Sequence, residues 1–192
     1  GGPEKTRAAF ARADERLRQA GLPPMHWNAM VATPEQSEAA RAAGFHSTSR
    51  YNVSTAGKVK PDATEDYEDV MEAHRQHWKN MLKAELMNIP VVTRGWDSSP
   101  RCRTDVPWPF PRNAKGGFEY PYSQIVTGVT PERFERLLRD AAQAVRDDPH
   151  APSAVLINAW NEWTEGQFLL PEEHYGTAHL EAVRKVFGTE KK

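Results

Sequence analysis

The sequence predicts an α/β fold, specifically about four β/α units that make up the C-terminal half of a (β/α)8 TIM-type barrel. A helical pattern is followed by four strand–helix pairs, and this alternation predicts a parallel sheet flanked by helices. No glycine-rich turn follows the first strand, which disfavours the competing doubly wound nucleotide-binding sheet. A complete barrel needs roughly 250 residues, so we interpret the 192 residues as one domain, 1–192, that lacks its N-terminal half.

The first half of the chain is expected to contain a helix at 4–20, a strand at 25–31, a helix at 33–44 and a strand at 45–53. The clearest signal is Thr33-Pro34-Glu35-Gln36, which is typical of a helix start. Thr33 can cap the helix, Pro34 suits the first turn and Gln36 completes a capping box.

The second half begins with the strongest helical pattern of the chain, an apolar stripe over residues 65–86. The stripe consists of Tyr67, Val70, Met71, His74, Trp78, Met81, Leu82 and Leu86. A strand at 88–93, a long loop at 102–127, a helix from 130 to 145, a strand at 155–157 and a last helix at 177–187 follow. Because 155–157 is a continuous apolar run, we expect this strand to be buried on both faces.

Composition excludes several classes of function. No apolar run approaches the ~18 residues of a membrane span, so we expect none. The net charge is -1 and the basic residues are scattered, so we expect no nucleic-acid partner. The single cysteine, Cys102, rules out an internal disulfide and provides no metal cluster, and we expect neither a metal nor a cofactor.

Two carboxylates follow the last strand, Glu162 and Glu165, and they stand among the tryptophans Trp160 and Trp163. Cleavage of a glycosidic bond needs one carboxyl as proton donor and a second as base or nucleophile. Neighbouring carboxylates disfavour double ionisation, so one of them would tend to hold its proton. The pattern predicts a sugar-cleaving site. The alternative is two exposed loop glutamates beside two core tryptophans.

The tryptophans offer flat apolar surfaces on which a sugar can stack. We favour Trp163 for the pocket, because alternation along a strand would let Trp160 pack beneath the adjacent helices instead. At the end of strand 88–93, Trp96 could stack on sugar and Asp97 could bind a sugar hydroxyl. Alternatively, Asp97 starts a turn and pairs with Arg101. Tyr51 stands at another strand end and is a further pocket candidate.

Two segments carry a resemblance to a known family. Ile157-Asn-Ala-Trp-Asn-Glu-Trp-Thr-Glu-Gly166, followed by Leu170-Pro-Glu-Glu-His-Tyr-Gly176, resembles the WbsX-type proteins of bacterial polysaccharide gene clusters. These are related to glycoside hydrolase family 99, the endo-α-mannosidases and mannanases. Gly95-Trp-Asp-Ser-Ser-Pro-Arg101 resembles the same family's second signature, and the resemblance covers roughly residues 80–187.

The resemblance implies a (β/α)8 barrel with the glutamate pair in its last strand–loop unit. It implies that Glu162 is a base that deprotonates the sugar's own 2-hydroxyl and that Glu165 is the general acid. The substrate would be α-linked mannose-like residues of an oligosaccharide or polysaccharide, in the bacterial cytoplasm or periplasm. The residues expected to bind substrate are Trp163, Asn161, Trp96, Asp97, Arg101, Tyr51 and Trp160.

Two further classes of function stay open. The chain could be a carbohydrate-binding or polysaccharide-assembly module without catalysis, or a WbsX-type glycosyltransferase. The contacts from the missing N-terminal barrel half would come from the same protein or from another chain, so this piece alone would be incomplete as an enzyme.

Overall fold

The computed structural model describes residues 2–102, 120–148, 150 and 153–188. Contacts divide the chain into two compact units whose segments alternate along the sequence. The first unit comprises 1–51, 76–90 and 144–156, and the second comprises 52–75, 91–143 and 157–192. The loop predicted at 102–127 lies mostly outside the described residues. The assignment of 1–192 to one domain stays a prediction.

The first unit contains a three-stranded parallel sheet with strand order β1-β2-β4. Its elements are α1 (Pro3–Gln19), β1 (Asn28–Met30), α2 (Pro34–Ala42), β2 (Ser47–Ser49) and β4 (Met87–Asn88). The predicted capping of α2 is confirmed, because the Gln36 backbone N–H donates to Thr33 Oγ1 at 3.3 Å. The capping box differs from the prediction, because Gln36 Oε1 accepts the N–H of Ala32, one residue before the cap, at 2.7 Å. Local chemistry therefore sets the start of this helix.

The second unit begins with β3 (Thr64–Asp66) and the start of α3 (Tyr67–Met81), which lead to β5 (Val91–Thr93) and β6 (Ile125–Thr127). It continues with most of α4 (Pro131–Asp147) and of β7 (Leu156–Asn158), and with β8 (Asn161–Glu162), β9 (Gln167–Phe168) and α5 (Ala178–Phe187). The 3-10 turns η1 (Ser99–Arg101) and η2 (Trp163–Glu165) follow β5 and β8. β3 pairs with β6 in parallel, β5 with β7, and β8 with β9 in an antiparallel hairpin.

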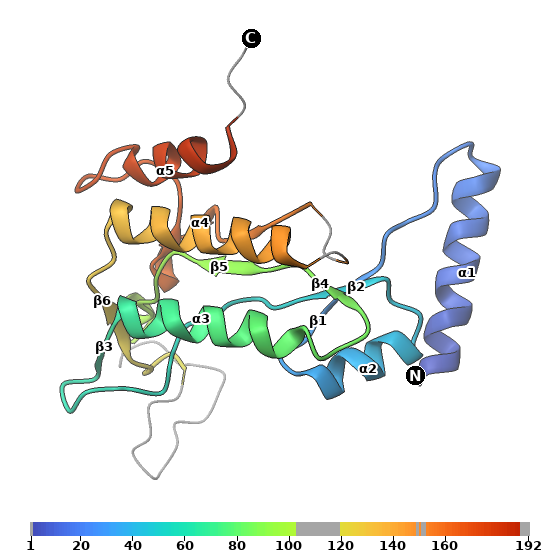
Figure 1. Cartoon of the computed structure of the whole chain (residues 1–192), viewed down its shortest axis with the longest axis horizontal. Helices are drawn as coiled ribbons and strands as arrows, with labels where there is room; N and C mark the ends of the chain where they lie inside the picture. Colours follow the sequence, from blue (N-terminus) through green and yellow to red (C-terminus); the bar gives the residue numbers. More distant parts are fainter. Residues whose placement is uncertain (1, 103–119, 149, 151–152, 189–192) are drawn as a thin grey trace. The chain divides into compact units, whose positions relative to one another are not determined.

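α3 and α4 lie side by side (Figure 1) and enclose the core of the second unit. Two ion pairs join the helices, Arg75 to Asp140 at 2.8 Å and Arg136 to Glu68. The fully buried side chains of this core are apolar or aromatic and include Tyr67, Val70, Met71, Val91, Val92, Phe134, Leu137 and Leu138. The helical stripe predicted from spacing thus forms the inner face of α3.

A buried hydrogen-bond network fixes the end of β5, from which the site segment emerges. His74 Nδ1 donates to the Val70 carbonyl at 2.8 Å and Nε2 accepts the Thr93 N–H at 3.0 Å. These partners require the neutral imidazole with its proton on Nδ1. Tyr67 Oη donates to the Thr93 carbonyl at 2.8 Å, and burial raises the pKa of this phenol. α3 therefore holds both polar groups of Thr93 in place.

Three expectations about element boundaries are wrong. The helix predicted over 65–86 ends at Met81 and leaves Leu82 exposed, and residues 64–66 form β3 because they pair with β6. β6 and the β8–β9 hairpin were not predicted. The strand at 155–157 is not buried on both faces, since Leu156 is 39% exposed. β7 pairs with β5 alone among the described strands, so it is an edge strand.

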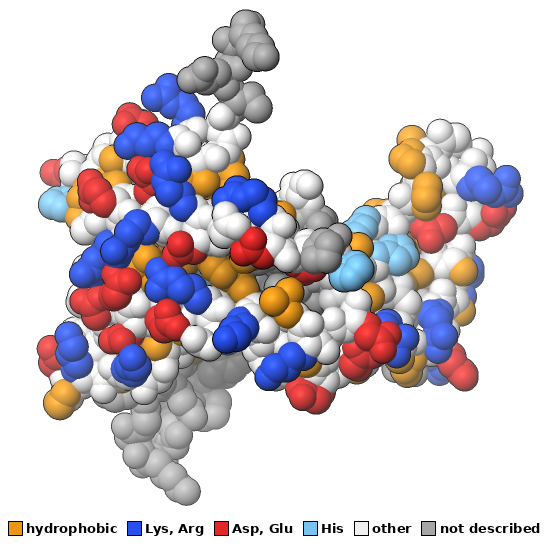
Figure 2. Space-filling model, in the orientation of Figure 1, with side chains coloured by type: hydrophobic (Ala, Val, Ile, Leu, Met, Phe, Trp, Pro, Cys, Tyr) orange, Lys and Arg blue, Asp and Glu red, His pale blue; other side chains and the backbone are white. Residues whose placement is uncertain are grey.

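Basic and acidic side chains are interspersed on the face of the molecule drawn in Figure 2. No described helix is both long and apolar enough to cross a membrane. In the described part of the chain, no group of three or more His, Cys, Asp or Glu side chains is arranged to hold a metal ion.

Candidate active site

The predicted carboxylates lie on the β8–β9 hairpin and its connecting turn. Glu162 ends β8 opposite Gln167, and Asn161 lies opposite Phe168. Between the strands, η2 carries Trp163, Thr164 and Glu165. Glu162 is therefore the last strand residue before the turn, and Glu165 lies within the turn.

Both carboxylates converge on the guanidinium group of Arg101. Arg101 Nη1 donates to Glu165 Oε1 at 2.6 Å, and Nη2 donates to Glu162 Oε2 at 3.2 Å. Arg101 Nε donates to Thr164 Oγ1 at 2.7 Å, so one side chain of η1 engages three residues of the hairpin region. Because two nitrogens of one planar group bind them, Glu162 and Glu165 lie on the same side of the chain.

The two carboxylates differ in their environment. The side chain of Glu165 is 9% exposed, whereas that of Glu162 is 38% exposed. Tyr120 Oη also donates to Glu165 Oε1, at 3.1 Å. One carboxyl is therefore enclosed by donors and the other is open to solvent.

A close approach between two backbones places the turn of Glu165 against the segment that follows β5. The Asp97 N–H donates to the Glu165 carbonyl at 2.8 Å. The next residue, Gly166, has a φ of +65°, and a Cβ there would lie 2.9 Å from Asp97 N. Only glycine combines this left-handed conformation with such a short distance.

Replacing Gly166 by Ala is expected to lower the free energy of unfolding by about 3 kcal/mol, from the left-handed backbone plus the steric clash. Gly176→Ala is a matched control, because Gly176 also has a positive φ, of +56°, but has nothing within 4 Å of the added Cβ. Gly176→Ala should lower the free energy of unfolding by about 1 kcal/mol. Urea denaturation measures both, and equal losses would contradict the close approach.

The side chains of Trp96 and Asp97 take structural positions in this segment. Trp96 is buried, and its Nε1 donates to Ser123 Oγ at 2.7 Å. Asp97 Oδ1 accepts the Ser99 N–H at 2.9 Å, as in the predicted Asp/Ser turn. The Arg101 guanidinium binds Glu162, Thr164 and Glu165 in place of the predicted partner Asp97. Sugar binding by Trp96, Asp97 or Arg101 stays a prediction.

The two tryptophans beside the carboxylates are both exposed, Trp160 by 56% and Trp163 by 45%. The alternative that Trp160 packs beneath helices is therefore wrong, because the chain leaves β7 for the hairpin at this point. Asn161 is also exposed. Tyr51 is exposed and belongs to the first unit.

A family model described as Glycosyltransferase WbsX matches residues 6–183. The chain belongs to the WbsX family. The WxcX protein of Xanthomonas campestris pv. campestris, in strain B100 and in a second strain, is 33% identical to it over 128 residues. This alignment covers 66% of the WbsX-family chain and 16% of WxcX, so the chain spans about a sixth of the curated relatives it matches.

Among solved structures, the chain is similar to the GH99 endo-alpha-mannosidase from Bacteroides thetaiotaomicron. The TM-score is 0.46 and the sequence identity 14%, with 84% of the WbsX-family chain and 45% of the mannosidase covered. What the structure establishes is an α/β fold with parallel strand pairs, and the closed barrel stays a prediction.

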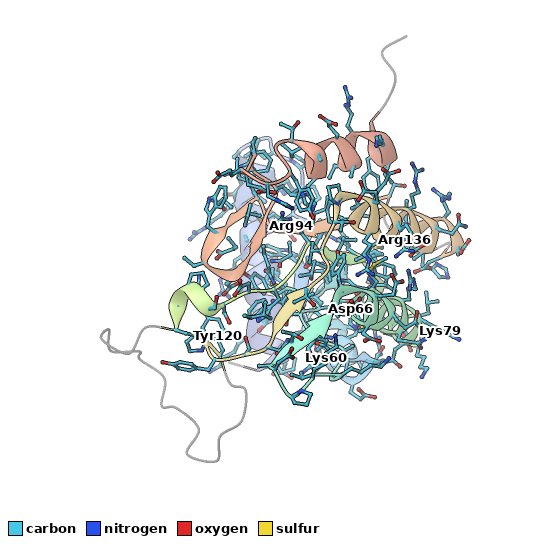
Figure 3. The ribbon with its side chains drawn as sticks, turned by 90° about the vertical axis from the view of Figure 1, so that its left-hand side faces the viewer. Lys60, Asp66, Lys79, Arg94, Tyr120 and Arg136 are labelled. Atoms are coloured by element: carbon cyan, nitrogen blue, oxygen red, sulfur yellow. The ribbon has the colours of Figure 1, made fainter. Side chains whose placement is uncertain are left out.

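Three residues of this WbsX-family site were not predicted from the sequence. Tyr120 binds Glu165, and Phe168 and Arg94 lie behind Trp163. Arg94 and Tyr120 are labelled in Figure 3. Arg94 directly precedes the quoted signature that begins at Gly95, and Phe168 falls just after the one that ends at Gly166. For Arg94 and Phe168, the one signal in the sequence was therefore their position next to a signature segment.

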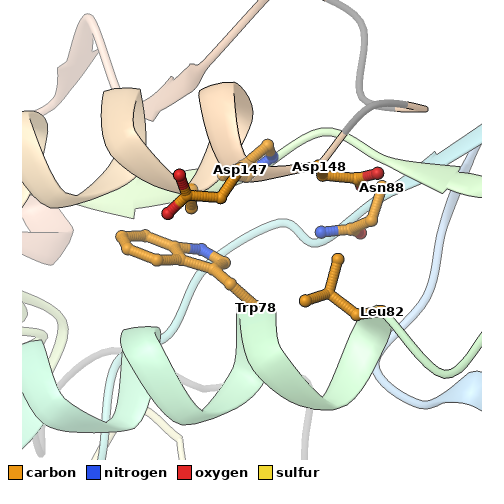
Figure 4. Close-up of a pocket in the computed structure, with 7 residues that line it drawn as sticks. Trp78, Leu82, Asn88, Asp147 and Asp148 are labelled. Atoms are coloured by element: carbon orange, nitrogen blue, oxygen red, sulfur yellow. The ribbon is translucent and has the colours of Figure 1, made fainter.

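A pocket of about 170 Å³ lies within the first unit and has no predicted site residue in its lining. Trp78, Leu82, Asn88, Pro90, Ala144, Asp147 and Asp148 line it (Figure 4). Asn88 ends β4 and Pro90 directly precedes β5 in the chain.

Proposed function

We propose that this chain is the catalytic C-terminal half of a glycoside hydrolase that acts on α-linked mannose-like residues of a polysaccharide or glycan. Glu165 is the general acid that protonates the leaving oxygen. Glu162 is the base that deprotonates the sugar 2-hydroxyl, whose oxygen then displaces the leaving group to form an anhydro sugar. Water opens this anhydro sugar and completes the hydrolysis.

The observation that carries this proposal is the binding of Glu162 and Glu165 to one guanidinium group, that of Arg101. Two carboxyl groups on one side of a turn can act on one glycosidic bond, whereas carboxyl groups on opposite sides cannot. Without sugar, Arg101 donates hydrogen bonds to both carboxyl groups and holds both side chains in place. Substrate hydroxyls would take over part of these contacts.

The surroundings of the carboxylates suit a sugar. Trp163 and Trp160 present exposed indole rings, and Asn161 presents an exposed amide beside Glu162. Apolar ring faces with a few polar groups at their edge are the usual lining of a small-ligand site. Of the proposed substrate contacts, these three residues lie nearest to Glu162 and Glu165 in the sequence.

We also propose that a further set of strands completes the barrel. Among the described strands, β1 is an edge of the β1-β2-β4 sheet, and β7 is an edge of the β5-β7 pair. Edge strands leave backbone N–H and C=O groups free to pair. The N-terminal half, from the same protein or another chain, would cover these edges and add substrate contacts.

A glycosyltransferase is the second candidate, because the matching family model carries that description. Transfer and hydrolysis differ in what they require. A transferase uses an activated sugar donor, whereas the proposed pair of carboxylates cleaves a glycosidic bond with water alone.

The deciding experiment incubates the full-length protein with α-linked manno-oligosaccharides, with and without a nucleotide-sugar donor, and analyses products by mass spectrometry. Hydrolysis predicts shorter oligosaccharides with new reducing ends in the absence of donor. Chain extension that depends on the donor would support the transferase instead. Binding without either product would indicate a module that has lost catalysis.

A further inference from the structure

Trp163 has one ring face covered from within the protein. The indole stacks on the ring of Phe168, with centroids 4.1 Å apart and an interplanar angle of 27°. Trp163 is nevertheless 45% exposed. The exposed surface is therefore the opposite face and the ring edge, which are the parts of an indole on which an apolar sugar face can rest.

Phe168 is in turn backed by a buried cation. The guanidinium carbon of Arg94 lies 4.4 Å from the Phe168 ring centroid. Arg94 is buried, and its Nη2 lies 3.4 Å from His179 Nδ1 and 3.7 Å from Glu172 Oε1. A cation over an aromatic face is attracted to it, most strongly when both are shielded from water. Trp163, Phe168 and Arg94 thus form three layers, which we call the platform stack.

The platform stack is tied to the turn that carries the proposed acid. Arg94 Nη1 donates to the Gly166 carbonyl at 3.5 Å, and Phe168 lies opposite Asn161 in the hairpin. The position of Trp163 relative to Glu162 and Glu165 therefore depends on the buried side chain of Arg94 and the half-buried side chain of Phe168. Arg94 is labelled in Figure 3.

We propose that Phe168 and Arg94 are positioning residues that hold Trp163 as a one-faced platform for a pyranose ring beside Glu162. This inference rests on the proposed function and adds a determinant of substrate binding to it. A flat ring held on one side binds a sugar at a lower entropic cost than a mobile one, because less side-chain freedom is lost on binding.

The test measures binding of mannotetraose by calorimetry in the full-length protein with Glu165→Gln, so that the sugar is not cleaved. Phe168→Leu removes the aromatic backing and is expected to weaken binding about 10-fold. Phe168→Tyr keeps the ring and should bind within about 2-fold of the parent. An unchanged dissociation constant for a folded Phe168→Leu variant would overturn the proposal.

A double-mutant cycle separates positioning from a general loss of structure. In a Trp163→Leu background, Phe168→Leu should have no further effect on binding, since the platform is already gone. If the losses of binding free energy from Trp163→Leu and Phe168→Leu simply add, the proposal is overturned. If Phe168→Leu does not fold, Arg94→Lys replaces it in the same cycle. Its ammonium keeps the charge beside Glu172 but loses the planar contact, and we expect binding about 3-fold weaker.

The same experiment keeps the two proposals apart. A parent protein that binds no mannotetraose would contradict both the proposed substrate class and the platform. A parent that binds mannotetraose, with a dissociation constant that the Phe168 and Arg94 variants leave unchanged, would contradict the platform stack alone.

Discussion

Glu165→Gln is expected to slow the cleavage of unactivated α-mannosides by about 10²–10⁴-fold, which is the usual contribution of a positioned general acid. The amide keeps the shape of the side chain, and it can still bind the donors from Arg101 and Tyr120. What it cannot do is donate a proton to the leaving oxygen. The measurement is the initial rate of new reducing ends in the full-length protein.

The leaving group distinguishes the two carboxylates. A substrate with a nitrophenolate leaving group needs little protonation, so Glu165→Gln should lose much less activity on it. Glu162→Gln should lose activity on both substrates, because the base is needed whatever the leaving group. Glu173→Gln is the matched control, an exposed glutamate of the same unit. A parent-like rate for Glu165→Gln on unactivated substrate would remove Glu165 from the acid role.

Acidification is expected to destabilise both units through a buried histidine in each. Burial lowers the pKa of His77 to about 4, and the nearby positive charge of Arg50 acts in the same direction. Burial likewise lowers the pKa of His179 to about 4, reinforced by Arg94 and opposed by Glu172 and Glu132. In the unfolded chain both would titrate near the ordinary value of about 6.5.

The sign of the effect follows from proton uptake. Above about pH 6.5 neither the folded nor the unfolded chain binds a proton at His77 or His179, so these groups do not make the stability depend on pH. Between about 6.5 and 4 the unfolded chain binds a proton that the folded chain excludes, and stability therefore falls as the pH falls. The loss levels off below about pH 4 and reaches about 3 kcal/mol for each histidine.

Urea denaturation from pH 8 to pH 4, with His179→Gln and His77→Gln beside the parent protein, measures this loss. The value at pH 8 gives the structural cost of each substitution, since neither His77 nor His179 is protonated there. Each variant should then lose less stability on acidification than the parent does. Each variant should remove only the share of the loss that belongs to its own histidine. Parallel pH profiles for parent and variant would contradict the assignment.

The helices of this protein could be predicted from the sequence, because their signals are local and repeat along the chain. The cap at Thr33 and the apolar face that includes Phe134 and Leu137 predicted helices that the structure confirms. β3, β6 and the β8–β9 hairpin could not be predicted in this way. Each has two or three residues, too few for a periodic pattern, and each forms because of a partner distant in the chain or across a turn.

By itself, the sequence determined much of the alternation of strands and helices and the family, and it predicted a pair of neighbouring carboxylates, since residue types and spacing carry that information. Only the tertiary structure decided which groups meet. One of two interpretations paired Arg101 with Asp97, four residues away, yet Arg101 binds Glu162 and Glu165, more than sixty residues away. Likewise, the exposure of Trp160 and the backing of Trp163 by Phe168 and Arg94 depend on how the hairpin packs after β7. Such contacts are formed by packing between segments that are far apart in the chain, so the local spacing of residue types does not predict them.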